Sequence, residues 1–308
     1  MSKNSKGFLE MPFSWLFAII TGIFILFFAF YFGSSLLKTG NQETSAKSAK
    51  QIQGFLNSIE NGLESSQTSS ISMPSDTRIK NICENTGVLG KEKISVEQKT
   101  FGKWSESDVK ISANNKYLFS NRQIEAKNLN IFSKPLKFSF SVGSLIYIIP
   151  KDKEYCFINA PSNLKGEINE LGLSNLKIGD CNGTKVCFNR GNCDIIVDYS
   201  SNSIRKGNET FYFALDPDDS LFYAALFSDK GVYECQLKRV IERAKILTKI
   251  YLEKQELLKN YCEDYITNDL TNMYNILDSY NDSRNLNDII LTAQELDNSN
   301  KFADCRLW

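Results

Sequence analysis

The sequence predicts an α+β protein with an N-terminal transmembrane helix, an amphipathic stem, an antiparallel β-rich ectodomain and a C-terminal segment of three helices. Three patterns carry this prediction: an uncharged apolar run near the start, alternation of apolar and polar residues in the middle, and helical spacing at the end. Hydrophobic residues make up 42% of the 308-residue chain, which is typical of a folded protein. Because 36 basic and 36 acidic residues cancel, nucleic acid is not an expected partner.

The first predicted element is a single-pass membrane anchor at residues 11–37. This run holds no charged residue and is bounded by Glu10 and Lys38. A helix of about 20 residues crosses the hydrocarbon core of a bilayer, whereas a cleavable signal peptide has an apolar run of about 7 to 15 residues. We therefore expect an uncleaved signal-anchor, a short cytoplasmic tail at residues 1–10, and the lipid bilayer as a partner.

The cysteines indicate that the domain after the anchor lies outside the cytoplasm. The charges that flank the apolar run are nearly balanced and barely decide its direction. An even number of cysteines without Cys-x-x-Cys spacing favours structural disulfides over a metal site, so we expect no metal and no cofactor. The eight disulfide candidates are Cys83, Cys156, Cys181, Cys187, Cys193, Cys235, Cys262 and Cys305. Possible glycosylation sites, which agree with export, begin at Asn182, Asn208 and Asn281.

One pairing can be argued from helix directions. Cys235 and Cys262 bracket one predicted helix and would lie roughly 40 Å apart, too far for a disulfide. If the three C-terminal helices run up, down and up, Cys305 returns to the end that holds Cys262, so a Cys262–Cys305 disulfide is favoured. One cysteine of the group Cys181, Cys187 and Cys193 is expected to reach Cys83, Cys156 or Cys235.

Residues 38–77 are expected to form the amphipathic stem helix and a linker. Apolar residues recur at helical spacing at Ala49, Ile52, Leu56, Ile59 and Leu63. Gly40 could separate this helix from the anchor, and the polar stretch 65–77 has the composition of a linker.

Residues 78–230 are expected to form the β-rich ectodomain. Leu136, Phe138, Phe140 and Val142 alternate with polar residues, as in a half-buried strand, and Gly143-Ser144 offers a hairpin turn into 145–149. Further strands are predicted at 93–101, 108–119, 122–132, 154–159, 185–188, 193–199 and 210–215, with one helix near 165–173.

Residues 231–308 return to helical spacing and predict three helices packed on the sheet. The first carries a run of basic residues interleaved with apolar ones, which predicts the solvated face of an amphipathic helix rather than a basic binding patch. These residues are Lys238, Arg239, Arg243, Lys245 and Lys249.

The sequence contains no recognisable catalytic set, and we expect a protein that is not an enzyme. It lacks histidine, which excludes Ser-His and Cys-His nucleophile systems and mixed Cys/His zinc sites. Asp216, Asp218 and Asp219 could bind calcium or serve a glycosidase, but Asp and Pro also form ordinary turns. We favour the turn for this loop.

The N-terminus resembles that of archaeal type IV pilin-like precursors, in which a Lys6-Gly7-Phe8 type junction precedes a long apolar helix. The resemblance covers about the first sixty residues and implies processing between Gly7 and Phe8 and a hydrophobic stem with a mainly β head. Glu10 is third after that junction, whereas the family has its acidic residue fifth. The same region resembles uncharacterised single-span surface proteins of small-genome archaea, a likeness that implies no activity.

These observations predict a membrane-anchored, extracytoplasmic structural or protein-interaction protein at the cell surface. Its expected partners are other membrane or surface proteins, or copies of itself. A ligand-binding ectodomain that serves a transporter or sensor is the second hypothesis, and an exported hydrolase that uses carboxylates is the third.

Overall fold

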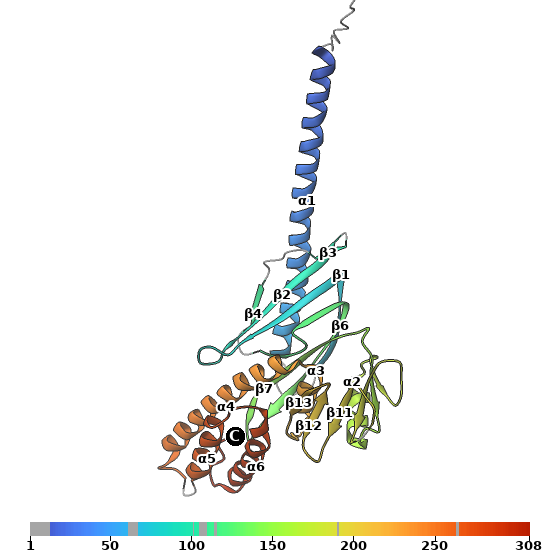
Figure 1. Ribbon diagram of the computed structural model, residues 1–308. Coiled ribbons are helices and arrows are strands. Elements are labelled where there is room, and N and C mark those ends of the chain that lie inside the picture. Colours follow the sequence, from blue (N-terminus) through green and yellow to red (C-terminus); the bar gives the residue numbers. More distant parts are fainter. Residues whose placement is uncertain are drawn as a thin grey trace, which may run out of the picture.

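The computed structural model describes residues 13–60, 67–100, 102–104, 110–113, 116–189, 191–262 and 265–308. The expected processing residues Gly7 and Phe8 lie outside these ranges. Figure 1 shows one long N-terminal helix attached to an α+β head, with the C-terminal helices at the end of the head far from the start of that helix. The predicted fold class is confirmed at this level.

Helix α1 (Phe13–Glu60) is one continuous helix of 48 residues, about 72 Å long at 1.5 Å per residue. It passes through Gly40 without interruption, so the expected separation of anchor and stem is absent. The first half projects from the head, and the second half lies along the first sheet (Figure 1). The expected anchor and the expected stem are therefore parts of one continuous helix.

The first sheet has seven strands in the order β3-β2-β1-β6-β7-β5, with β4 also paired to β2. Its pairings are antiparallel except for β5 with β7. The strands are β1 (Gln67–Glu84), β2 (Lys91–Thr100), β3 (Lys103–Trp104), β4 (Lys110–Ala113), β5 (Tyr117–Phe119), β6 (Gln123–Lys137) and β7 (Ser141–Pro150).

Two separate cores cover the two faces of this sheet, and strand β7 contributes to both. Leu145, Tyr147 and Ile149 belong to the large core shared with the C-terminal helices. Ile146 and Ile148 belong to the smaller core formed with α1. Burial on both faces explains why this strand is an unbroken apolar run rather than an alternating one.

The stretch 65–77, which we expected to be a linker, is a strand from Gln67 onward. Residues Gln67–Ser72 pair with Phe132, Ser133 and neighbouring residues of β6. Exposed and half-buried side chains alternate here because one face of β1 is solvated, and its serines made the stretch look like a linker. The head therefore begins before Arg78.

The hairpin between β6 and β7 turns earlier than expected. Gly143 and Ser144 lie inside β7, opposite Leu136 and Pro135. The turn is formed instead around Ser139, where Phe138 N–H donates to the Phe140 carbonyl at 3.1 Å. Phe140 lies in this turn rather than in a strand, and its ring packs against Tyr251 and Trp308.

The second sheet has six strands in the order β13-β12-β11-β10-β8-β9. The strands are β8 (Tyr155–Ile158), β9 (Leu176–Ile178), β10 (Thr184–Phe188), β11 (Ile195–Asp198), β12 (Ser203–Lys206) and β13 (Glu209–Tyr212). The four strands β9, β8, β10 and β11 run parallel, so the purely antiparallel expectation is wrong for this part. Helix α2 (Ser162–Leu171) provides the crossover that parallel β8 and β9 require.

The other helical elements of the described residues are α3 (Ser220–Phe227), α4 (Lys230–Leu258), α5 (Thr267–Asp278), the 3-10 turn η1 (Ser283–Asn285) and α6 (Leu286–Phe302). Every residue of α3 is buried. Residues of α4, α5 and α6 share the large core with β5, β6 and β7. Helix α4 contacts β1, β5 and β7 of the first sheet, and α5 packs between α4 and α6. Helix α4 thus covers the face of the first sheet opposite α1.

Candidate functional site

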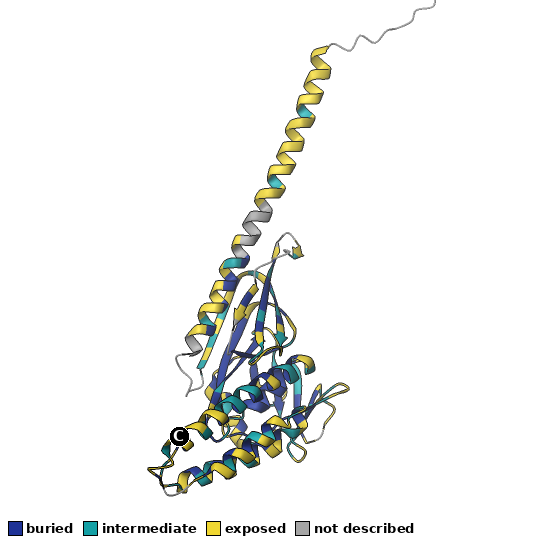
Figure 2. Ribbon diagram, turned by 90° about the vertical axis from the view of Figure 1, so that its left-hand side faces the viewer, coloured by how far each residue is buried: buried dark blue, intermediate teal, exposed yellow. Residues whose placement is uncertain are grey.

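The first half of α1 is an exposed apolar surface. Residues Phe13–Leu36 have a mean hydropathy of 2.4 and none of them is buried, so by length and composition this segment is able to cross a membrane. The exposed fractions of Phe17, Phe27 and Phe30 are 64%, 65% and 78%. Figure 2 shows this half of the helix as an almost continuous exposed rod beyond the head.

The second half of α1 belongs to the head. Ala49, Ile52 and Leu56 are at most 3% exposed and pack in the smaller core, between α1 and the first sheet. A hydrogen bond joins the same surfaces, because the Gln98 amide of β2 donates to the Ser48 hydroxyl. The helix is therefore fixed to the sheet by apolar and polar contacts.

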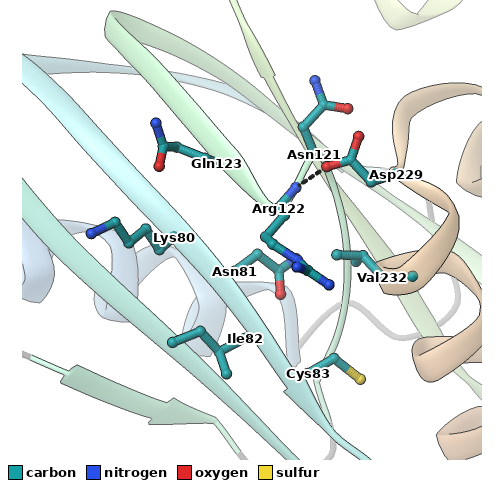
Figure 3. Close-up of a pocket in the computed structure, with 10 residues that line it drawn as sticks. Lys80, Asn81, Ile82, Cys83, Asn121, Arg122, Gln123, Asp229 and Val232 are labelled. Atoms are coloured by element: carbon teal, nitrogen blue, oxygen red, sulfur yellow. Dashed lines mark hydrogen bonds between the residues drawn. The ribbon is translucent and has the colours of Figure 1, made fainter.

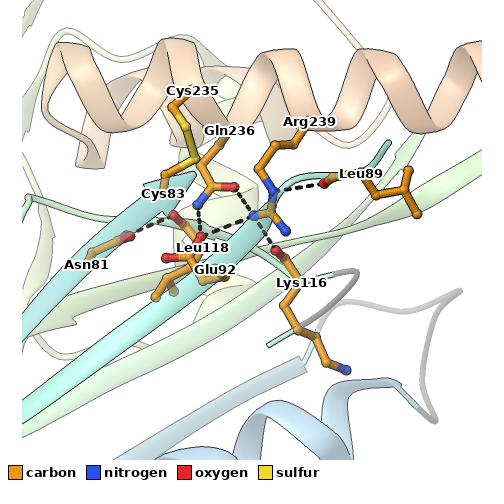
Figure 4. The surroundings of a disulfide bond; sticks show 9 residues. All are labelled: Asn81, Cys83, Leu89, Glu92, Lys116, Leu118, Cys235, Gln236 and Arg239. Atoms are coloured by element: carbon orange, nitrogen blue, oxygen red, sulfur yellow. Dashed lines mark hydrogen bonds and ion pairs between the residues drawn. A yellow bond between two sulfur atoms is a disulfide. The ribbon is translucent and has the colours of Figure 1, made fainter. Parts of the chain in front are cut away.

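A buried charged cluster joins β2 to α4. Glu92, Gln236 and Arg239 are at most 1% exposed. The Glu92 carboxylate accepts hydrogen bonds from the Gln236 amide and from Arg239 Nη1, the latter at 3.1 Å. Burial raises the pKa of Glu92 to about 8, although the Gln236 hydrogen bond and the Arg239 charge both lower it. Figure 4 shows this cluster beside the Cys83–Cys235 disulfide.

The burial of Arg239 contradicts the prediction that this residue lies on a solvated face. Two loops cover it. Arg239 Nε donates to the carbonyl of Leu89, in the loop between β1 and β2, at 3.1 Å, and Nη1 donates to the carbonyl of Lys116, just before β5, at 2.9 Å. A Cβ atom at Gly90 would lie 2.9 Å from Arg239 Cγ, so only glycine permits this close approach. Lys238 and Lys249 are exposed as expected.

All eight cysteines are paired in four disulfides, which fit an oxidising compartment. The pairs are Cys83–Cys235, Cys156–Cys181, Cys187–Cys193 and Cys262–Cys305. Cys262–Cys305 is the pair that the expected helix directions favour. Within the group Cys181, Cys187 and Cys193, it is Cys181 that bonds to a cysteine outside the group, Cys156. The three glycosylation candidates Asn182, Asn208 and Asn281 are exposed.

Asp216, in the acidic loop before α3, has a structural role. Its Oδ2 accepts hydrogen bonds from the Ser220 N–H at 3.0 Å and the Ser220 hydroxyl at 2.7 Å, and Oδ1 accepts from the Leu221 N–H at 3.0 Å. These bonds satisfy N–H groups at the start of α3 that have no partner within the helix. Burial raises the pKa of Asp216, which these hydrogen bonds oppose.

A buried lysine supplies positive charge to the same loop. The Lys134 ammonium donates to the Asp218 carbonyl at 2.7 Å and forms an ion pair with Glu167. Burial lowers the pKa of Lys134, and the nearby carboxylates of Asp218 and Asp219 raise it. Within the described ranges, no group of three His, Cys, Asp or Glu residues is arranged to hold a metal ion.

Sequence reasoning did not find α3 or the buried cluster. An eight-residue apolar run such as α3 has no polar face, so its periodicity does not separate helix from strand. Glu92 and Arg239 are 147 residues apart, and no local pattern joins them. The spacing of Gln236 and Arg239 by three residues on one helix face was the available signal.

Comparison with known proteins adds no relative. No protein-family profile, curated protein or solved structure matches this chain.

Proposed function

We propose that this chain is a membrane-anchored, extracytoplasmic structural or protein-interaction protein, without enzymatic activity. The observation that supports this most directly is the division of α1 into an exposed apolar half and a half that is buried in the head. The four disulfides agree with a head outside the cytoplasm.

The apolar half needs a non-aqueous environment. Burying one large apolar side chain stabilises a protein by about 1.5 to 3 kcal/mol, so a segment of 24 mostly apolar residues is strongly driven out of water. A bilayer satisfies this requirement for a single chain. Packing of α1 helices from several chains satisfies it in an assembly, as the resemblance to pilin-like precursors implies.

The attachment of α1 to the head supports a structural role. Because the helix is continuous and packs on β1 and β2, the head is displayed without a hinge in the described part of α1. Such a geometry presents one defined surface to partners. A ligand-binding ectodomain is the second candidate, and it is favoured by a cleft described in the next subsection.

Membrane residence and direction are tested by fractionation of cells that express the full chain. We expect the protein to stay in the membrane pellet after alkaline carbonate extraction, and protease added outside intact cells to digest the head. A matched variant with Ile23→Lys and Phe27→Lys should leave the pellet, because two central charges oppose insertion. Release of the unmodified chain by carbonate, or a head protected in intact cells, would overturn this part of the proposal.

Self-assembly is tested by a photo-crosslinking side chain placed at Phe28, with the exposed head position Gln53 as a control. Crosslinked oligomers from position 28 would support association through α1, and monomers alone would exclude it. Mass spectrometry of the mature N-terminus distinguishes the two forms of the proposal: a start at Phe8 supports pilin-like processing, and an intact Met1 supports a simple anchor.

A further inference from the structure

A cleft of about 570 Å³ opens between the end of β1, the start of β6 and the start of α4. This volume is within the range of about 300 to 1,000 Å³ that is usual for ligand sites. Arg122, Asn81 and Gly231 are among its lining residues, and Figure 3 shows side chains from all three elements directed around it. None of these residues contributes to the anchor or to the buried cluster.

Hydrogen-bond donors converge on one side of the cleft. Helix α4 begins at Lys230, and the side chain of its N-cap residue Asp229 does not cap it. The N–H groups of Gly231 and Val232, which line the cleft, thus lack the partners that a cap would give. A Cβ atom at Gly231 would lie 3.3 Å from Arg122 Nη2, so glycine allows the guanidinium to lie over the first turn of α4. This combination favours an anion.

The Arg122 guanidinium is available to such an anion. Asp229 is the acidic residue of the cleft lining, and its carboxylate accepts the backbone N–H of Arg122 at 2.5 Å rather than the guanidinium. Among the residues that the structure describes, no carboxylate forms an ion pair with Arg122. Lys80 also lines the cleft, but its ammonium forms an ion pair with the Glu97 carboxylate, so Arg122 is the lining cation that has no carboxylate partner in the described part of the chain.

The cleft lining also contains a hydrogen-bond acceptor. Asn81 is 2% exposed, and its amide nitrogen donates to the Leu118 carbonyl and the Ser120 hydroxyl, both at 3.0 Å. Its amide oxygen is buried and has no partner in the described part of the chain. In Figure 3 this oxygen points toward the space bordered by Ile82 and Cys83. A buried acceptor of this kind needs a donor from a ligand or from water.

The neighbouring edge of β1 is also open. Pairing of β1 with β6 ends at Lys80, and Asn81 N–H then donates to the Arg122 carbonyl at 2.8 Å. Because backbone groups two residues apart face the same edge, Cys83 directs its N–H and C=O toward the cleft. No described strand pairs with this edge at Cys83, and Cys83 is one of the residues that line the cleft.

We infer that this cleft binds the free carboxyl-terminal end of an extended polypeptide from a partner protein. Arg122 and the start of α4 hold the terminal carboxylate, the Asn81 oxygen accepts the N–H of the last residue, and the edge of β1 at Cys83 pairs with the preceding backbone. The exposed apolar side chain of Ile82 favours an aliphatic last residue. This inference deepens the proposed role in binding other proteins, and it does not depend on membrane insertion.

The test uses the full chain in detergent micelles and an array of N-terminally immobilised random hexapeptides, made with a free carboxylate or with a terminal amide. We expect binding to a subset of the free acids, and amidation of the best binder should weaken it by about tenfold or more. Arg122→Gln should weaken binding to a similar extent, and Gly231→Ala should also weaken it by crowding the guanidinium. Arg205→Gln, at an exposed arginine on β12, should leave binding unchanged.

Thermal unfolding of each variant shows whether the head still folds. Equal binding of acid and amide, wild-type binding by folded Arg122→Gln, or the absence of any bound peptide would overturn the inference. Displacement of the best peptide by inorganic phosphate alone, at equal concentration, would also overturn it in favour of a general anion site. Any of these results leaves carbonate extraction and crosslinking through α1 unaffected, so the two proposals fail separately.

Discussion

The Glu92 carboxylate of β2 lies 3.1 Å from the Arg239 guanidinium of α4, and both side chains are almost fully buried. Beside them, Cys83 of β1 is bonded to Cys235 of α4. The first sheet, which carries α1, is thereby fixed to α4.

The first prediction concerns the pH dependence of stability. Because burial raises the pKa of Glu92 from 4.5 to about 8, the folded protein binds a proton in this interval that the unfolded chain releases. The free energy of unfolding should therefore fall as pH rises from about 4.5 to about 8, by up to about 1.4 kcal/mol per pH unit. Urea unfolding of the full chain and of Glu92→Gln checks this, since the variant should lack that part of the slope. A wild-type slope identical to that of the variant contradicts it.

The second prediction compares two disulfides. Cys83–Cys235 closes a loop with a sequence separation of 152, and Cys187–Cys193 one of 6. In the chain-entropy description, the longer loop contributes about 3 kcal/mol more to stability. We expect the double serine variant of the long-range pair to lose that much more free energy of unfolding than the variant of the short-range pair. Equal losses would show that loop entropy does not dominate.

The third prediction tests whether α1 is part of the folded head. Ile52 is fully buried, so Ile52→Ala should lower the free energy of unfolding by about 2 to 5 kcal/mol. The neighbouring Gln53 is exposed, and Gln53→Ala should change it by no more than about 0.5 kcal/mol. Denaturant titration monitored in the head measures both. Indistinguishable variants would mean that α1 is not packed on the sheet.

The fourth prediction separates the carboxylates of the acidic loop. Asp216→Ala removes three hydrogen bonds at the start of α3 and should cost about 2 kcal/mol or more. Asp218→Ala retains the backbone carbonyl that binds Lys134 and should be nearly neutral. Thermal unfolding of the two variants tests this assignment. A larger loss of stability in Asp218→Ala than in Asp216→Ala would contradict this assignment.

Periodic patterns predicted the elements, whereas the arrangement of those elements depended on distant contacts. The helical spacing of Leu270, Met273 and Leu277 predicted α5 because one face of that helix is buried. β1 was missed over Gln67–Thr77 because its serines lie on a partly solvated strand and look like a loop. The parallel order of β8 and β10 has no local signature, since it is set by crossover connections.

The candidate sites were less predictable for the same reason. Asp216 was recognised as unusual, but its partners at Ser220 and Leu221 became visible only when α3 was in place. Asn81 and Arg122 are ordinary polar residues in the sequence. Their significance arises because β1, β6 and the start of α4 meet at one point.

The unbroken course of α1 gives the head a fixed rotational phase. A residue inserted between the exposed half and the packed half of this helix would turn the head by about 100° around the helix axis and raise it by about 1.5 Å. If neighbouring helices hold Phe13–Leu36 in an assembly, their packing therefore also determines the direction in which the Arg122 cleft faces around the helix axis.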